Sequence, residues 1–135
     1  MVITPIVAST IRRLPTVNIG YLRARLGKLS TPEQLSSTIA ALHQGRSTVY
    51  HAGAGMLTVT AEPPDLHIAN LTSPALLTDI NQRILLAHAQ AVGARNLTAH
   101  VVNPTVARIM REKLGWSMDS PTPTGWWMSL PVGGP

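Results

Sequence analysis

The sequence predicts a single α/β domain over residues 1–135, in which helices cover both faces of a mixed β-sheet. Its length suits one domain with an ordinary hydrophobic core. Hydrophobic residues make up 44% of the chain, which is typical of a globular protein. Segments with helical and with β-strand patterns alternate from end to end, and glycine or proline marks most of the boundaries.

The first half of the chain contains one well-marked helix, expected over residues 31–44. Thr31 can cap its N-terminus, Pro32 suits the first helical position, and Gln34 completes a capping box. The other elements expected here are a strand over residues 2–7, a basic helix over residues 16–26 and a hairpin of the two segments STVYHA and MLTVTA.

The second half is expected to alternate strands and helices around one long helix. This helix is predicted from Pro74 to Val92, with Ser73 as its N-cap. Its apolar stripe places Leu77, Ile80 and Ile84 on the sheet. The flanking elements are a strand at Leu66–Leu71, a strand at Leu97–Val102, a helix capped by Asn103 and ended by Gly115, and closing strands at Trp116–Asp119 and Gly125–Leu130.

The composition excludes several classes of function. Because the chain has no cysteine, it has no disulfide, zinc–cysteine site or thiol nucleophile. The histidines lack the spacing of metal ligands, so no metal cofactor is expected. No apolar run approaches the roughly 18–20 residues of a membrane span, and the N-terminus lacks a secretory signal pattern. The sequence therefore predicts a soluble, cytoplasmic protein without a membrane partner.

The net charge of +5 arises in the first 30 residues, because the rest of the chain has six basic and six acidic side chains. Such a segment attracts nucleic acid or another polyanion by neutralising phosphates. Two other interpretations stay open, a solvated helix face and an Arg-rich transit peptide, although Pro15 and Gly20 interrupt the helix that a transit peptide needs. This basic segment consists of Arg12, Arg13, Arg23, Arg25 and Lys28.

The order of elements from Met56 to Leu130 resembles that of the GNAT N-acetyltransferases. In that family two antiparallel strands lead to a central strand, a long helix, a splayed strand, a short helix and a final β pair. The most specific match is RIMREKLGW, residues 108–116, which is similar to the family ending A-x-x-L-Y-E-K-L-G-F, with Ala107 in the alanine place. The resemblance implies a GNAT-like fold and acyl-CoA-dependent N-acyl transfer.

The cofactor loop of that family is altered in this chain. GNAT enzymes hold the CoA pyrophosphate on the backbone of an R/Q-x-x-G-x-G/A loop, where glycine permits close approach. The corresponding residues 72–79 contain no glycine, arginine or glutamine, and Asp79 adds a negative charge. Acetyl-CoA is therefore expected to bind weakly or not at all. If it binds, the resemblance implies contacts with Ser73, Ala75, Leu76, Leu77, Thr78 and Asn103.

The same resemblance makes two residues catalytic candidates. His67 is on the predicted central strand, from which GNAT enzymes often supply a general base, and an imidazole suits that task. The alternative is a polar side chain that alternates with core residues Leu66 and Ile68. Arg111 replaces the tyrosine that many GNAT enzymes use as a general acid. Because arginine stays protonated, Arg111 can stabilise an anion but cannot donate the proton.

Three functions stay open from the sequence. The first is an acyltransferase with an altered CoA site. The second is a non-catalytic binding or assembly protein of the same fold, including a homo-oligomer. The third is a nucleic-acid-binding or DNA-modifying protein of the phage type, which would use the basic segment. Fold alone does not decide among them.

Overall fold

The computed structural model describes residues 10–27, 30–53 and 55–133. The described residues form a seven-stranded sheet in the order β1-β2-β3-β4-β5-β7-β6, together with four α-helices. The sheet is mixed, because β4 and β5 pair in parallel whereas β5 and β7 pair antiparallel. This confirms the predicted α/β class. The chain divides into two compact units, which are described one at a time: Met1–Thr60 with Ala69–Leu76, and Ala61–Ile68 with Leu77–Pro135.

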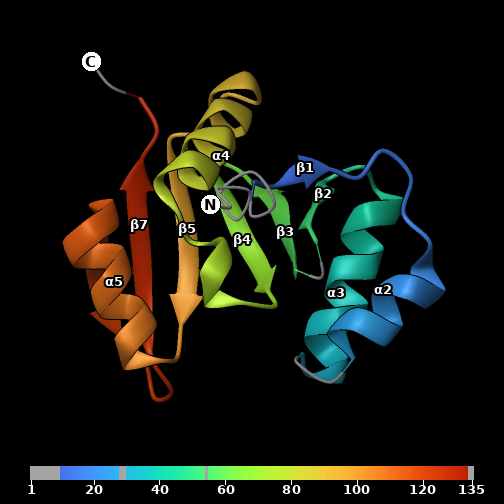
Figure 1. Cartoon of the computed structure of the whole chain (residues 1–135), viewed down its shortest axis with the longest axis horizontal. Coiled ribbons are helices and arrows are strands. Elements are labelled where there is room, and N and C mark those ends of the chain that lie inside the picture. Colours follow the sequence, from blue (N-terminus) through green and yellow to red (C-terminus); the bar gives the residue numbers. More distant parts are fainter. Residues whose placement is uncertain (1–9, 28–29, 54, 134–135) are drawn as a thin grey trace, which may run out of the picture. The chain divides into compact units, whose positions relative to one another are not determined.

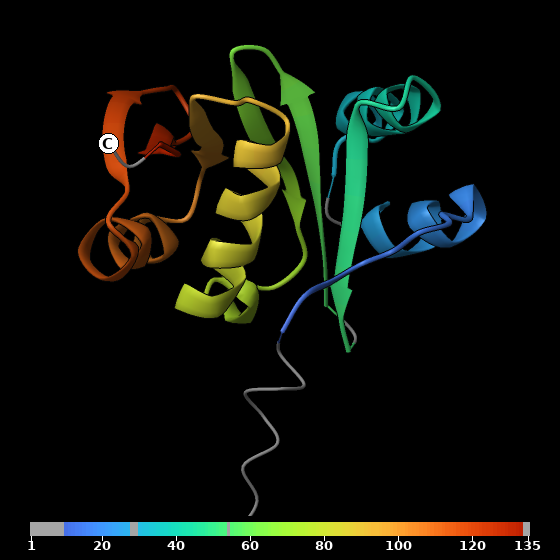
Figure 2. The ribbon, with the colours of Figure 1, turned by 90° about the horizontal axis from the view of Figure 1, so that it is seen from above.

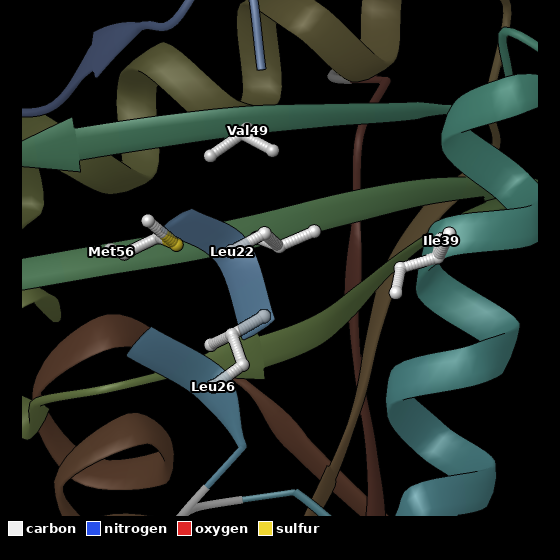
Figure 3. Close-up of a cluster of buried hydrophobic side chains, with 5 residues drawn as sticks. All are labelled: Leu22, Leu26, Ile39, Val49 and Met56. Carbon is white, nitrogen blue, oxygen red and sulfur yellow. The ribbon is translucent and has the colours of Figure 1, made fainter. Parts of the chain in front are cut away.

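The core of the first unit lies between two helices and two strands. Helices α2 (Ile19–Leu26) and α3 (Pro32–His43) lie side by side, and β2 (Ser47–Ala52) pairs with β3 (Gly55–Glu62) as an antiparallel hairpin (Figure 1). The buried cluster between these elements is drawn in Figure 3 and consists of Leu22, Leu26, Ile39, Val49 and Met56. Burial of these side chains ties both helices to the hairpin.

Most predictions for the first unit are confirmed. The capping box of α3 is present, because Gln34 N donates to Thr31 Oγ1 over 3.1 Å and Thr31 N donates to Gln34 Oε1 over 3.0 Å. Helix α2 starts later than predicted, since Asn18 Oδ1 accepts from Tyr21 N over 3.0 Å and so caps the helix. The strand predicted over residues 2–7 lies outside the described residues. A short strand that was not predicted, β1 (Arg12–Arg13), pairs with β2.

The second unit places two helices on one side of its strands. Strand β5 pairs with β7, β7 pairs with β6, and α4 and α5 lie on the same side of β5 and β7 (Figures 1 and 2). Leu97, Ala99 and Val101 are buried, while Thr98 and His100 point to the opposite face of β5. Strand β4 (Asp65–Leu71) starts in the second unit and ends in the first. The other elements of the second unit are α4 (Asp79–Ala91), β5 (Asn96–Val101), α5 (Pro104–Leu114), β6 (Ser117–Pro121) and β7 (Trp126–Pro131).

The prediction of a long helix from Pro74 is wrong at its N-terminus. Pro74–Leu76 forms a 3-10 turn, and α4 begins at Asp79 because Thr78 Oγ1 accepts from Asn81 N over 3.2 Å. Ser73 therefore does not cap α4; its hydroxyl accepts from Ala75 N instead, over 3.2 Å.

The buried stripe of α4 also differs from the prediction. Ile80 is 44% exposed, whereas Asn81, Leu85 and Ala89 are buried. The prediction placed only apolar residues in the buried stripe and so missed Asn81. Asn81 can be buried because every buried side-chain nitrogen or oxygen of the described residues has a hydrogen-bond partner. No helix in the described ranges has the length and apolar character needed to cross a membrane.

Candidate active site

His67 lies on the open face of the sheet in the second unit. It is directly opposite Thr98 in the parallel pairing of β4 with β5, and its Nδ1 lies 2.9 Å from Thr98 Oγ1. The face behind it is the buried one, since Leu66 and Leu97 are almost fully buried. No residue in the described part of the chain makes a hydrogen bond to His67 Nε2. The half-buried imidazole thus has one nitrogen anchored and one available.

Two further rings surround His67. His100 and Trp127 are directly opposite each other on β5 and β7. The ring centroids of His100 and Trp127 are 5.0 Å apart, and those of His67 and Trp127 are 5.9 Å apart. Trp127 is nevertheless 46% exposed, whereas large aromatic side chains are usually more buried. We refer to His67, His100 and Trp127 as the histidine–tryptophan cluster.

The tautomer of neutral His100 follows from its hydrogen-bond partner. Thr122 Oγ1 lies 2.8 Å from His100 Nε2 and already accepts from the backbone N–H groups of Gly125, over 2.9 Å, and Thr124, over 3.3 Å. With both lone pairs used, the Thr122 hydroxyl donates its own hydrogen to His100 Nε2. The ring hydrogen of neutral His100 is therefore on Nδ1. This nitrogen is not the one that contacts Thr122, and its N–H can act as a donor.

Burial controls the protonation of His67. It lowers the pKa of His67 below the ordinary 6.5, because the charged imidazolium loses hydration. The negative charge of Glu62 raises this pKa, the neighbouring His100 lowers it, and the backbone of Thr98 as a hydrogen-bond partner raises it, but all three effects are smaller than that of burial. Near neutral pH the side chain of His67 is consequently neutral and can accept a proton.

Only part of the predicted cofactor loop has free backbone donors. Ala75 N donates to Ser73 Oγ and Leu76 N donates to Ser73 O, each over 3.2 Å. Pro74 has no N–H group. The backbone N–H groups of Leu77 and Thr78, and of Asp79 and Ile80 in the first turn of α4, make no hydrogen bond to any described residue. The available donors therefore belong to the end of the loop and the start of the helix.

These donors fit one phosphate group of CoA, since the N-terminus of an α-helix favours anions. Asp79 is less unfavourable than the sequence suggested, because its carboxylate pairs with Arg83 at 2.9 Å and both side chains are mostly exposed. A glycine-rich loop around a complete pyrophosphate is missing, because residues 72–79 contain no glycine. The donors that remain are the backbone N–H groups of Leu77, Thr78, Asp79 and Ile80.

Two other predicted site residues lie on α5. Asn103 caps this helix, because its Oδ1 accepts from Thr105 N over 2.8 Å and from Val106 N over 3.4 Å. This occupies the oxygen that would otherwise be offered to a ligand. Arg111 is exposed, and its Nη1 lies 3.7 Å from Met118 Sδ on β6. Within the described ranges, no hydrogen bond or ion pair joins His67 to Arg111.

Four arginines of the basic segment are described, and Lys28 lies outside the described residues. None of the four forms an ion pair with a described acid, and Arg25 Cζ lies 5.6 Å from the ring centroid of Tyr21. Over residues 10–27, 30–53 and 55–133, no three histidine, aspartate or glutamate side chains are grouped as metal ligands. The four arginines of the basic segment that the structure describes are Arg12, Arg13, Arg23 and Arg25.

Sequence reasoning missed the association of His100 and Trp127 with His67. Strand alternation does put Thr98 and His100 on the same face of β5, so that half of the association could have been found. The position of Trp127 depends on the register of β5 with β7, which the sequence leaves open. Trp126 and Trp127 are neighbours on β7 and so point to opposite faces of the sheet, and their exposure differs accordingly, since Trp126 is half-buried and Trp127 is exposed.

No protein-family model matches the sequence, and no curated protein matches it either. Solved structures do resemble the chain. A GNAT-family protein from Desulfovibrio desulfuricans is 15% identical with a TM-score of 0.61, over 92% of this chain and 99% of that one. The ribosomal-protein-S18-alanine N-acetyltransferase from Escherichia coli is 17% identical with a TM-score of 0.60, over 93% and 95%.

A third similar structure contains the cofactor. The PaiA N-acetyltransferase from Thermoplasma acidophilum, in complex with coenzyme A, is 12% identical with a TM-score of 0.55, over 89% of this chain and 98% of that one. At these identities the similarity concerns the fold. The chain has a GNAT-like fold, as the resemblance implied.

Proposed function

Because the chain has a GNAT-like fold, we propose that it is an N-acyltransferase with an altered acyl-CoA site. The observation that carries the proposal is the state of His67. Its imidazole is held through Nδ1 by Thr98, is kept neutral by burial, and has Nε2 without a partner among the described residues. An imidazole so placed suits a general base. Acyl-CoA, when bound, supplies an activated acyl group as a thioester.

His67 removes a proton from the acceptor in this mechanism. With the ring hydrogen on Nδ1, Nδ1 donates to Thr98 Oγ1 and Nε2 has the lone pair that accepts a proton. The proton comes from the acceptor amine as its nitrogen forms the new amide bond. The acyl C–S bond of the thioester would break in the same transfer, and CoA would leave as a thiolate that takes its proton from water. The imidazolium produced is stabilised by the negative charge of Glu62, which already raises the pKa of His67.

The histidine–tryptophan cluster provides the surface for the acceptor. Trp127 offers an exposed aromatic face next to the base, at 5.9 Å between ring centroids. His100 adds an Nδ1–H donor, because its Nε2 is occupied by Thr122. An acceptor that lies against Trp127 would displace water from around His67 Nε2. With less water in the site, the electrostatic interactions between its charged groups become stronger.

Other residues have supporting roles. The backbone N–H groups of Leu77, Thr78, Asp79 and Ile80 would hold a phosphate of acyl-CoA, which is weaker than the hold of a glycine-rich loop. Arg111 contributes positive charge and no proton. Asn103 serves α5 as its cap, so we assign it no contact with the cofactor.

The test is thiol release from acetyl-CoA in the presence of a panel of primary amines. His67→Gln is expected to lower kcat by about 10²–10⁴-fold, the usual contribution of a general base. His51→Gln, a matched change on β2 outside the cluster, is expected to leave kcat within twofold. Retained folding is checked by circular dichroism and by the Tm. Equal rates for wild type and His67→Gln, or no turnover with any amine, would contradict the proposal.

A second candidate function is binding of nucleic acid. The observation that favours it is the lack of ion pairs at Arg12, Arg13, Arg23 and Arg25 among the described residues. Guanidinium groups without an acidic partner can neutralise phosphates. This function is compatible with acyl transfer, because the arginines belong to the first unit and His67 belongs to the second. Its test is the salt dependence of duplex DNA binding, which is steep when arginines neutralise phosphates.

A further inference from the structure

The strands that carry the histidine–tryptophan cluster contain no lysine or arginine, and neither does β6, which pairs with β7. Because side chains alternate along a strand, residues two positions apart share a face. The neighbours that the three cluster members acquire in this way are Asp65, Thr98 and Ser129. Helices α4 and α5 lie on the other side of β5 and β7 (Figure 2). This face thus combines aromatic rings with hydroxyl groups and a carboxylate.

The charge next to His67 is negative. Asp65 shares the face of His67, and its Oδ1 accepts a hydrogen bond from Asn96 Nδ2 over 3.1 Å. No lysine or arginine in the described part of the chain forms an ion pair with Asp65. The charge of Glu62 also reaches His67, because it raises the pKa of that imidazole. Charges interact more strongly near a protein surface than in bulk water, so a cation is favoured here and an anion is not.

The indole of Trp127 has room for an aromatic partner. Its ring centroid lies 5.0 Å from that of His100 and 5.9 Å from that of His67, and both imidazoles are tilted at 53° to its plane. Neither imidazole is therefore stacked in parallel on the indole, which is exposed and makes no hydrogen bond to a described residue. An offset parallel stack is a preferred arrangement of two aromatic rings, and it is open to a ligand here.

The negative charge and the open indole together favour a cationic aromatic ligand. Tryptophan attracts a cation near its ring face more strongly than the other aromatic side chains do. An ammonium group can also donate a hydrogen bond to His67 Nε2, which has no partner among the described residues. An aromatic ligand with a phosphate or a carboxylate would instead place negative charge near Asp65 and Glu62. The surface therefore favours an aromatic amine over a nucleotide or an aromatic acid.

We propose that the histidine–tryptophan cluster binds a primary amine that a short alkyl chain joins to an aromatic ring. The aromatic ring stacks on Trp127, and the ammonium group lies next to His67 Nε2, on the face that also carries Asp65. A short chain is enough, because the rings of His67 and Trp127 are neighbours, with centroids 5.9 Å apart. Binding does not require catalysis, whereas use of this amine as the acyl acceptor rests on the proposed function. The ligand covers one indole and is not enclosed, so we expect a dissociation constant on the order of 1 mM.

The experiment is an NMR titration of the full chain with phenethylamine near neutral pH, without CoA. We expect a saturable shift of the indole N–H signal of Trp127 and no shift for that of Trp116, which is buried and donates to Gln82. Cyclohexylethylamine, which has the same charge without the aromatic ring, should bind at least threefold more weakly. Phenylpropanoate, which has the same ring and linker with a carboxylate, should bind at least tenfold more weakly. No saturation, or an affinity for either comparison compound equal to that for phenethylamine, would overturn the proposal.

Two pairs of variants locate the site, with amide signals of β5 and β7 as the measure of binding and the Tm as the check of folding. Trp127→Ala should weaken phenethylamine binding at least tenfold, whereas Tyr21→Ala, which removes an equally exposed aromatic ring from α2, should leave it within twofold. Asp65→Asn should weaken it at least threefold, whereas Glu112→Gln, which removes the same charge from α5, should leave it within twofold. Equal weakening by the two members of either pair would refute the site.

Binding and acyl transfer are tested separately. Saturable binding of phenethylamine without thiol release from acetyl-CoA would support the site and contradict the proposed function. Acyl transfer with equal kcat/KM for phenethylamine and cyclohexylethylamine, together with equal affinity for the two amines, would leave the proposed function in place and overturn the assignment of an aromatic amine.

Discussion

The indole of Trp127 and the imidazole of His100 lie 5.0 Å apart between ring centroids, with their planes at 53°. The relationship is fixed at both ends, because the two residues are directly opposite in the pairing of β5 with β7 and Thr122 holds His100 Nε2 at 2.8 Å. Tilted aromatic pairs at this separation are favourable beyond the area that they bury. Trp127 is therefore held in place beside His67 although it is 46% exposed.

The first prediction is that Trp127→Ala raises the pKa of His67 toward 6.5. Burial is the largest cause of the lowered pKa of His67, and removal of the neighbouring indole admits water to the imidazole. The pKa is measured by NMR titration of the His67 ring hydrogens. Trp127→Phe keeps an aromatic ring and should change the pKa less. An unchanged pKa in Trp127→Ala would show that other groups bury His67.

The second prediction concerns stability at mildly acidic pH. Because the folded-state pKa of His67 is below 6.5, the unfolded chain takes up a proton at this position first as the pH falls. His67 therefore contributes stability that is present above pH 6.5 and is lost as the pH falls through the folded pKa. Urea unfolding at a series of pH values should show a smaller decline for His67→Gln than for wild type. Parallel curves for the two proteins would contradict the prediction.

The third prediction concerns the contact between α4 and the end of α5. Trp116 Nε1 donates to Gln82 Oε1 over 2.7 Å, and Gln82 Nε2 donates to Leu114 O over 2.9 Å. Trp116 is 4% exposed, so Gln82→Ala leaves its indole N–H without a partner. We expect a loss of about 1–3 kcal/mol in the free energy of unfolding. Gln90→Ala, at an exposed position of α4, is the control and should change it by less than about 0.5 kcal/mol.

The limits of prediction from sequence are visible when the N-termini of α3 and α4 are compared. Thr31 and Gln34 form the predicted capping box of α3 because both partners are local in sequence. Before α4 the sequence offers two residues that could cap the helix, Ser73 and Thr78. Ser73 accepts a hydrogen bond from the 3-10 turn, and Thr78 caps α4. Local pattern does not decide between them. Leu76 in the 3-10 turn is 4% exposed, and its burial is a tertiary contact that the local sequence pattern does not show.

The candidate site was predicted in part for a similar reason. His67 and the altered loop follow from a linear motif and from the order of elements. The cluster around His67 depends on two strand registers, which place His67 opposite Thr98 and His100 opposite Trp127. The sequence of a strand does not show which residue of the neighbouring strand it will face. Asn81 shows the same limit, because a buried asparagine is favourable only when tertiary structure satisfies it.

The fourth prediction is that acetyl-CoA binds weakly through the first turn of α4. For a dissociation constant near 1 mM, 1 mM ligand stabilises the native state by about 0.4 kcal/mol. The Tm should then rise by only about 1–2 °C. Asp79→Asn removes a negative charge next to the free N–H groups and should enlarge the shift, while Arg83→Gln leaves Asp79 unpaired and should reduce it. A large shift in wild type would show that the loop binds well without glycine.

The last prediction concerns the basic segment and duplex DNA. Each neutralised phosphate contributes about −0.9 to the slope of log affinity against log salt, so three to five contacts give a slope of about −3 to −4.5. Replacement of two arginines, Arg12→Ala with Arg23→Ala, should flatten the slope by about two units. Arg83→Ala with Arg108→Ala, which removes the same charge outside the segment, should leave the slope unchanged. Binding should be indifferent to sequence, because phosphate contacts carry no base information. Fluorescence anisotropy with labelled DNA at several salt concentrations measures all three proteins. No binding at low salt, or equal flattening by the two double variants, would show that the arginines of the segment are a solvated surface.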